Sequence, residues 1–137
     1  MITLRNAQLQ EIFAHARKAT PFECCGLIGG ANERASSIHP LRNIANNPQR
    51  AYEAAPEELF AAQRQMREHG EQLLAIYHSH PRSTEPAPSK TDVRLAYYPA
   101  AIYLIVGLGG ATPIMRGFRI SERGKTWQQV EYDVADE

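Results

Sequence analysis

The sequence predicts a single α/β domain, residues 1–137, in which helices flank a central β-sheet. Two observations predict this class. Segments with apolar residues at helical spacing alternate with short, fully apolar runs of the kind that buried strands show. The length agrees, since 137 residues fall within the usual size of one domain and can bury a sizeable core. No repeat, linker or low-complexity tract divides the chain.

The first half of the chain is expected to form a helix and a hairpin. A helix begins near Asn6, because apolar residues follow it at helical spacing. These residues are Leu9, Ile12, Phe13 and Ala16. Residues 22–28 and 35–41 are predicted strands, and the turn at residues 29–32 joins them as a hairpin.

A second helix is expected from Pro56 to Gly70, because proline suits a first helical position and glycine a helix end. The apolar run at residues 73–77 predicts a buried strand directly after it. Further along, the expected elements are a helix and three strands, of which the last two close the sheet at one edge. Their ranges are 90–98 for the helix, and 101–106, 112–120 and 127–134 for the strands.

Two histidines end the buried strand at residues 73–77. Alternate side chains of a strand share a face, so His78 and His80 are expected to point the same way and Ser79 the opposite way. At this spacing both imidazoles can reach one ion at about 2.0–2.1 Å. The pair alone also fits one buried and one exposed histidine.

A third metal ligand is expected at the start of the helix after the histidines. Ser89 suits an N-cap, and Asp92 lies three positions on, in the first turn. Ser-x-x-Asp is also close to a capping box, which needs no metal. Both fragments lie in order within fifteen residues, which favours a His-His-Asp zinc site with one open position for water.

A metal-bound water needs a base, and Glu23 is the candidate. It is the only acid in an otherwise apolar segment, so its charge must be paired or used. A salt-bridged Glu23 and an exposed Glu23 at a strand edge stay open as alternatives.

These residues together resemble the JAMM motif of the MPN-domain (Jab1/MPN/Mov34) metallopeptidases, in which a distant Glu precedes His-x-His and Ser-x-x-Asp. The matching segments are Glu23 within residues 21–30, His78 to Pro81, and Pro88 to Asp92. The small stand-alone bacterial members are most similar. The resemblance implies an MPN-type domain with a mixed sheet in a cytidine-deaminase-like layout.

The resemblance also implies roles and a substrate. One zinc ion per chain is bound by His78, His80 and Asp92, Glu23 takes the proton of the bound water, and Ser89 stabilises the oxyanion. Similar bacterial members trim ubiquitin-like sulfur-carrier proteins at their C-terminal Gly-Gly. One departure concerns the loop between His80 and Ser89, whose eight residues are one more than the family usually has. We expect the loop to absorb the extra residue without disturbing the zinc ligands.

Composition argues against several partners. Fifteen basic residues balance fifteen acidic ones, so no electrostatic footprint for nucleic acid is present. No apolar run is long enough for a membrane span, and no secretion signal is apparent, which makes the cytoplasm the expected compartment. The oligomeric state is not predicted.

The remaining reactive side chains are expected to be structural. Cys24 and Cys25 are adjacent, face opposite sides of a strand, and are predicted to be reduced core residues. A thiol nucleophile or a redox brake beside Glu23 is the minority interpretation. His15, His39 and His69 are also assigned no catalytic role.

The preferred function is zinc-dependent hydrolysis of an amide bond at the Gly-Gly end of a carrier protein. Two alternatives are a non-catalytic MPN scaffold and a deubiquitinase-like isopeptidase. A zinc-dependent nucleoside deaminase is disfavoured, because it expects His-x-Glu followed by Pro-Cys-x-x-Cys.

Overall fold

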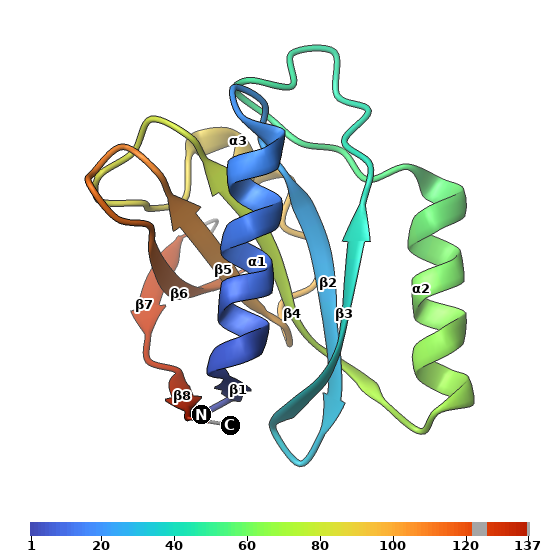
Figure 1. Cartoon of the computed structure of the whole chain (residues 1–137). Coiled ribbons are helices and arrows are strands. Elements are labelled where there is room, and N and C mark those ends of the chain that lie inside the picture. Colours follow the sequence, from blue (N-terminus) through green and yellow to red (C-terminus); the bar gives the residue numbers. More distant parts are fainter. Residues whose placement is uncertain (122–125, 137) are drawn as a thin grey trace.

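The structure, a computed structural model of the chain, describes residues 1–121 and 126–136. The helices are α1 (Asn6–Ala19), α2 (Pro56–Glu68) and α3 (Lys90–Arg94). The strands are β1 (Thr3–Arg5), β2 (Cys25–Ala31), β3 (Arg34–Leu41), β4 (Gln72–His80), β5 (Ile102–Gly107), β6 (Ile114–Ile120), β7 (Trp127–Val130) and β8 (Asp133–Ala135). Figure 1 shows α1 and α2 on either side of the sheet.

The described strands form one mixed sheet in the order β7-β6-β5-β4-β2-β3-β1-β8. Parallel pairing joins β4 to β5 and β1 to β3 and β8, and the other neighbours are antiparallel. The predicted fold class, a mixed sheet flanked by helices, is confirmed. β4 lies in the middle of the order between β2 and β5, so both of its edges are hydrogen-bonded.

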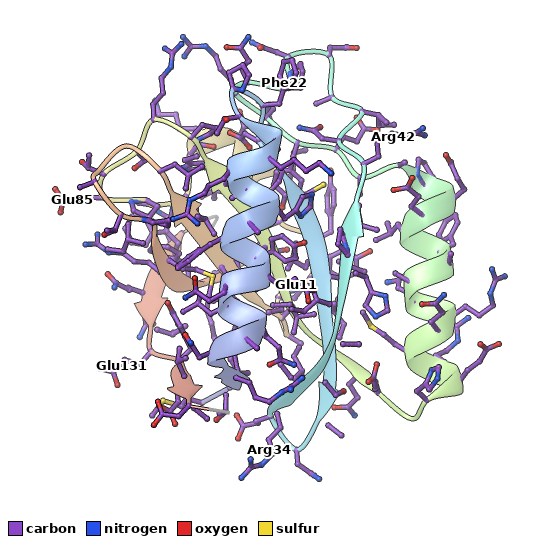
Figure 2. All side chains as sticks on the ribbon, viewed as in Figure 1. Glu11, Phe22, Arg34, Arg42, Glu85 and Glu131 are labelled. Carbon is purple, nitrogen blue, oxygen red and sulfur yellow. The ribbon has the colours of Figure 1, made fainter. Side chains whose placement is uncertain are left out.

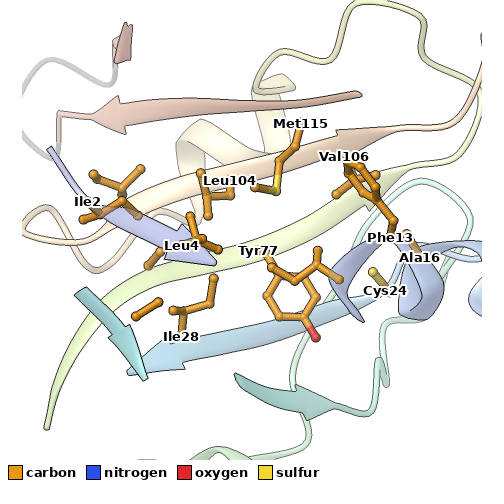
Figure 3. Close-up of a cluster of buried hydrophobic side chains, with 14 residues drawn as sticks. Ile2, Leu4, Phe13, Ala16, Cys24, Ile28, Tyr77, Leu104, Val106 and Met115 are labelled. Carbon is orange, nitrogen blue, oxygen red and sulfur yellow. The ribbon is translucent and has the colours of Figure 1, made fainter. Parts of the chain in front are cut away.

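Two apolar clusters cover the two faces of the sheet. Along β4, Ala75 and Tyr77 pack in the cluster under α1, whereas Ile76 packs in the cluster under α2 and α3. Figure 3 shows the first cluster around Leu104 and Tyr77. Charged side chains such as Arg34, Glu85 and Glu131 project outward (Figure 2). Strand alternation carries on to the histidines, so His78 and His80 belong to the face of Ile76.

Several predicted boundaries were wrong by a few residues. The first predicted strand begins at Cys25 and not at residue 22, and the hairpin turn lies at Asn32 and Glu33, which both have positive φ. Gly29 and Gly30 lie within β2, where the pairing register shifts. A Cβ at Gly30 would lie 2.0 Å from the carbonyl oxygen of Arg34, so the bulge requires glycine.

Two larger predictions also need correction. The helix expected at 90–98 ends at Arg94, in line with Pro99, which disfavours helical backbone at the residue before it. The segment 127–134 does not close one edge. β7 pairs with β6 at one end of the sheet, and β8 pairs with β1, a strand that was not predicted, at the other end. Only Glu131 and Tyr132 separate these two strands, so the sheet curls until its ends meet.

Candidate metal centre

The end of β4 presents both histidines on one face. His78 is fully buried, and His80 is partly buried at the strand end. Their Nε2 atoms lie 3.2 Å apart. Ser79 points the opposite way, where its hydroxyl accepts a hydrogen bond from the Cys24 N–H at 2.8 Å. The structure therefore has one fully buried and one partly buried histidine on the same face, and not the alternative of one buried and one exposed histidine.

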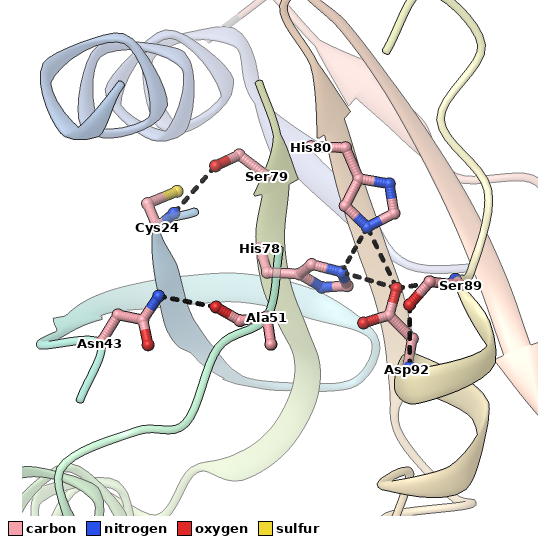
Figure 4. Close-up of polar contacts among 8 residues, drawn as sticks. All are labelled: Cys24, Asn43, Ala51, His78, Ser79, His80, Ser89 and Asp92. Carbon is pink, nitrogen blue, oxygen red and sulfur yellow. Dashed lines mark hydrogen bonds and ion pairs between the residues drawn. The ribbon is translucent and has the colours of Figure 1, made fainter. Parts of the chain in front are cut away.

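The start of α3 places Asp92 against both imidazoles. Oδ2 of Asp92 lies 3.1 Å from Nε2 of His78 and 3.1 Å from Nε2 of His80 (Figure 4). The same oxygen accepts the Ser89 N–H at 2.9 Å, and the Ser89 hydroxyl accepts the Asp92 N–H at 3.0 Å. The capping box and the histidine contacts thus coexist, because one carboxylate serves both.

The spacing of these three atoms matches that of metal ligands. Two ligands that lie 2.0–2.1 Å from a tetrahedral ion are about 3.3–3.4 Å apart. The three separations, 3.1, 3.1 and 3.2 Å, are close to this value. Residues 81–88 do not prevent the arrangement, and Pro86 within that loop is buried. The donor set therefore fits a divalent metal ion.

Charge at this cluster also suits a cation. Burial by itself raises the pKa of Asp92, but the facing His78 and the hydrogen bonds from His80 and Ser89 hold that pKa well below its usual value. Burial lowers the pKa of His78. An ionised aspartate and a neutral imidazole are the forms that bind a metal.

Glu23 lies beside the cluster but does not join its hydrogen bonds. Its side chain is buried, and Oε1 has no hydrogen-bond partner among the described residues. One carboxylate oxygen of Glu23 and a ring nitrogen of each histidine all lie within 4.8 Å of one another. Burial, with a smaller contribution from the charge of Asp92, raises the pKa of Glu23 to about 8. Neither an exposed nor a salt-bridged Glu23 is observed in the described part of the chain.

The backbone of Glu23 is held by the segment between β3 and α2, residues 42–55. The Glu23 N–H donates to the carbonyl of Pro48 at 2.7 Å, and the Asn43 side-chain amide donates to the carbonyl of Glu23 at 3.0 Å. Asn43 also donates to Ala51 and accepts from the N–H groups of Ala45 and Glu53. Asn43 was not predicted as a site residue, although asparagine in an irregular segment commonly forms hydrogen bonds of this kind with nearby backbone.

Tyr52, in the same segment, was missed as well. Its ring stacks on His78 with centroids 4.4 Å apart and an interplanar angle of 28°. The stacking restricts the plane of the imidazole. Nδ1 of His78 is buried without a hydrogen-bond partner among the described residues, so the ring is oriented by this stacking and by the contact of its Nε2 with Asp92.

Two cavities flank the centre. One, of about 330 Å³, is lined by Glu23 and His80 together with Arg50 and Arg82. The other, of about 520 Å³, reaches Asp92 and is largely apolar. Its apolar lining includes Leu41, Leu59, Ile76, Leu95, Tyr97 and Tyr98. Glu23 and Asp92 therefore face different cavities.

The other predicted structural residues behave as expected. Cys24 and Cys25 are free and buried, and they pack in different clusters on opposite faces of the sheet. His15 Nδ1 lies 2.7 Å from the Tyr77 hydroxyl, and His69 Nδ1 lies 2.8 Å from the carbonyl of Gln65 within α2.

An α/β domain that gathers two histidines and an aspartate beside a separate buried glutamate has the donor set of a metallohydrolase centre. The chain belongs to the JAB family, because the family profile described as prokaryotic homologs of the JAB domain matches residues 5–121. The family predicted from the motif is confirmed, and so is the expected class of enzyme, a peptidase.

Similar proteins include two named enzymes. Desampylase of Haloferax volcanii is 36% identical over 105 residues, which are 72% of this chain and 75% of that protein. The CysO-cysteine peptidase of Mycobacterium tuberculosis is 34% identical over 108 residues, which are 77% of this chain and 73% of that protein. A crystal structure of a JAB1/MPN domain protein from Archaeoglobus fulgidus covers 98% of this chain and 99% of that one with a TM-score of 0.65. At 19% identity this structure supports the fold alone.

Proposed function

We propose that this chain is a zinc-dependent peptidase that hydrolyses the amide bond after the C-terminal Gly-Gly of a ubiquitin-like sulfur-carrier protein. The observation that carries the proposal is the triangle of His78, His80 and Asp92 donor atoms beside the unpartnered carboxylate of Glu23. The names desampylase and CysO-cysteine peptidase describe enzymes that cut protein conjugates. They support a ubiquitin-like carrier as the partner of this chain. Such a substrate is in keeping with a cytoplasmic enzyme.

Each predicted site residue has a proposed task. His78, His80 and Asp92 hold the ion, whose chemistry when bound is Lewis-acid polarisation of a water molecule and of the substrate carbonyl. Glu23 accepts the proton of the attacking water at its carboxylate, and later gives that proton to the leaving amine nitrogen. Burial raises the pKa of Glu23 above the ordinary carboxylate range, and a pKa closer to neutral pH favours return of the proton to the leaving nitrogen.

Ser89 is proposed to stabilise the oxyanion. Its oxygen already accepts the Asp92 N–H, so the hydroxyl hydrogen is left to donate to a carbonyl oxygen that becomes negative. The capping box holds Ser89 in place, which removes the need to reorganise it during the reaction.

The test offers zinc-loaded protein a panel of sulfur-carrier proteins, each extended beyond its Gly-Gly end by one residue, and follows cleavage by intact mass. We expect trimming of at least one carrier, loss of trimming with a chelator, and its return with added zinc. A ubiquitin joined to a lysine side chain serves as the deubiquitinase arm. Trimming that survives both the chelator and Glu23→Gln would contradict the mechanism. A folded protein that binds no zinc would favour the scaffold alternative.

A further inference from the structure

Given the proposed function, the position of Glu23 decides from which side of the centre the amine leaves. Hydrolysis adds the hydroxyl of water to the carbonyl carbon and a proton to the nitrogen as the C–N bond breaks. Because Glu23 delivers that proton, the nitrogen must leave on the side of Glu23. The cavity lined by Glu23 and His80 is then the leaving-group cavity, and the apolar cavity at Asp92 is left for the carrier tail.

The leaving-group cavity carries two cations. Arg50 and Arg82 line it, and neither side chain forms an ion pair within the part of the chain that the structure describes. Glu23 is the only acid in the lining, and it is buried. The other lining residues, Pro21, Gln49, Pro81 and Ser83, are neutral. The surface of this cavity is therefore suited to an anion.

Both arginines lie on braced turns, so their backbones are fixed beside the cavity. The Arg50 N–H donates to the carbonyl of Asn47 at 3.1 Å, next to the bond between Glu23 and Pro48. After Arg82, the Ser83 N–H donates to the carbonyl of His80 at 3.1 Å, and the Ser83 carbonyl accepts the Gly109 N–H at 2.8 Å. A Cβ at Gly109 would lie 2.3 Å from the Arg82 carbonyl oxygen, so the two loops pack in direct contact.

We propose that Arg50 and Arg82 bind the free α-carboxylate of the amino acid that leaves. Guanidinium groups match carboxylates in shape and donate charge-assisted hydrogen bonds. The cavity volume, about 330 Å³, lies at the low end for small-molecule sites and suits one amino acid. The enzyme is thus selective for removing a single C-terminal residue, and a carrier joined through a lysine side chain is a poorer substrate.

The test compares three substrates that share one carrier and differ only after Gly-Gly. The first ends in alanine with a free carboxylate, the second in alanine carboxamide, and the third is joined to the side-chain nitrogen of a lysine blocked at both its α-groups. We expect kcat/KM for the free acid to exceed that for the other two by about tenfold or more. Arg50→Gln with Arg82→Gln should remove this preference, so that kcat/KM for the free acid falls to that for the carboxamide measured with the same variant. Arg64→Gln, on the exposed face of α2, is the matched control.

Equal kcat/KM for acid and carboxamide in the unsubstituted protein would overturn the proposal, and so would a preference that persists in the double variant. A second measurement separates this outcome from failure of the proposed function. Zinc-loaded Glu23→Gln protein is titrated with the uncleaved acid and carboxamide by calorimetry. Tighter binding of the acid that depends on both arginines supports the inference even where no substrate is cleaved, and equal binding overturns it.

Discussion

A single oxygen atom, Oδ2 of Asp92, connects the fold to the chemistry of the centre. It accepts the N–H of the helix-capping residue Ser89 and faces both histidines. The backbone hydrogen bond orients the carboxylate before any ion arrives, so little side-chain entropy remains to be lost on binding. The orientation of Asp92 is therefore set by α3 and not by the metal.

Glu23 and Asp92 should respond differently to loss of charge. Glu23→Gln keeps the volume of the side chain but removes the base, so we expect kcat to fall by about 10²–10⁴-fold while zinc stays bound at one ion per chain. Asp92→Asn should bind zinc weakly. Elemental analysis after gel filtration, together with kcat, separates the two. Loss of zinc from the Glu23→Gln protein would mean that Glu23 is a ligand.

His15 should make stability depend on pH. Burial, and secondarily the charge of Lys18, lowers the pKa of His15 in the folded protein below the ordinary value of 6.5. Well above pH 6.5 the residue is neutral in both states and the pKa shift has no effect. As the pH falls below 6.5, the unfolded chain takes up the proton first, so the free energy of unfolding decreases until the folded pKa is passed. Urea denaturation at several pH values measures this.

His15→Gln should flatten that pH dependence. The control is His69→Gln, because His69 is exposed at the end of α2. Identical slopes for the original and the His15→Gln proteins would show that burial does not lower the pKa of His15.

At the scale of single residues, much of the site was predictable from sequence. Strand alternation alone places His78 and His80 on one face, and the three-residue spacing of Ser89 and Asp92 gives the cap. The environment of Glu23 was not predictable, since its partners come from residues 43 and 48 through an irregular segment. No periodicity marks such contacts.

At the scale of elements, the irregular segment at residues 42–55 positions residues of the site, a role that helices and strands usually have. Its strand-like pairing is one isolated bridge, Asn43 to Ala54, and the side chain of Asn43 adds further hydrogen bonds to those between backbone groups of the segment. The segment contributes Arg50 to one cavity and Tyr52 to the other. Its conformation therefore decides the shape of both sides of the centre.

Asn43→Asp tests this brace. The carboxylate can still accept from Ala45 and Glu53 but can no longer donate to the carbonyls of Glu23 and Ala51. We expect a loss of about 1–3 kcal/mol in the free energy of unfolding, and a fall in kcat because Glu23 loses its anchor. Urea denaturation and kcat measure these two effects. Asn47→Ala is the matched control, since the hydrogen bonds at Asn47 use its backbone carbonyl.

Ser89→Ala should weaken both the cap and the reaction. The loss of an N-cap side chain costs about 1 kcal/mol of stability. Ser89→Thr restores the acceptor for the Asp92 N–H, so its stability should return, and its activity should return in part. If Ser89→Ala lowers stability but leaves kcat unchanged, Ser89 acts only as a cap.

Across the whole molecule, the curl of the sheet is the feature that the sequence did not reveal. β1 and β8 have three residues each, too few for a recognisable alternation, and their pairing is between the two ends of the chain. The Tyr132 hydroxyl donates to the Met115 carbonyl at 2.5 Å, which ties the connection between β7 and β8 to β6. Non-local pairings of this kind leave no local signal.

The hydrogen bond between Tyr132 and Met115 offers a test of the prediction that residues 1–137 form one domain. We expect unfolding by urea to be a single transition with coincident fluorescence and circular dichroism curves. Tyr132→Phe should lower the free energy of unfolding by about 1 kcal/mol without splitting the transition. Tyr97→Phe, at a largely exposed tyrosine, is the control. Two separated transitions would show that the curled sheet is not one cooperative unit.

The two adjacent free cysteines, Cys24 and Cys25, have a consequence for chemical labelling of the intact protein. Each thiol is buried in a different apolar cluster, and burial raises the pKa of Cys24 to about 11 and that of Cys25 to about 12. An alkylating reagent reaches Cys24 only when the cluster under α1 opens, whereas Cys25 also lines the cavity that reaches Asp92. The labelling rates at these two adjacent positions therefore report on different parts of the fold, the packing of α1 at Cys24 and the access to that cavity at Cys25.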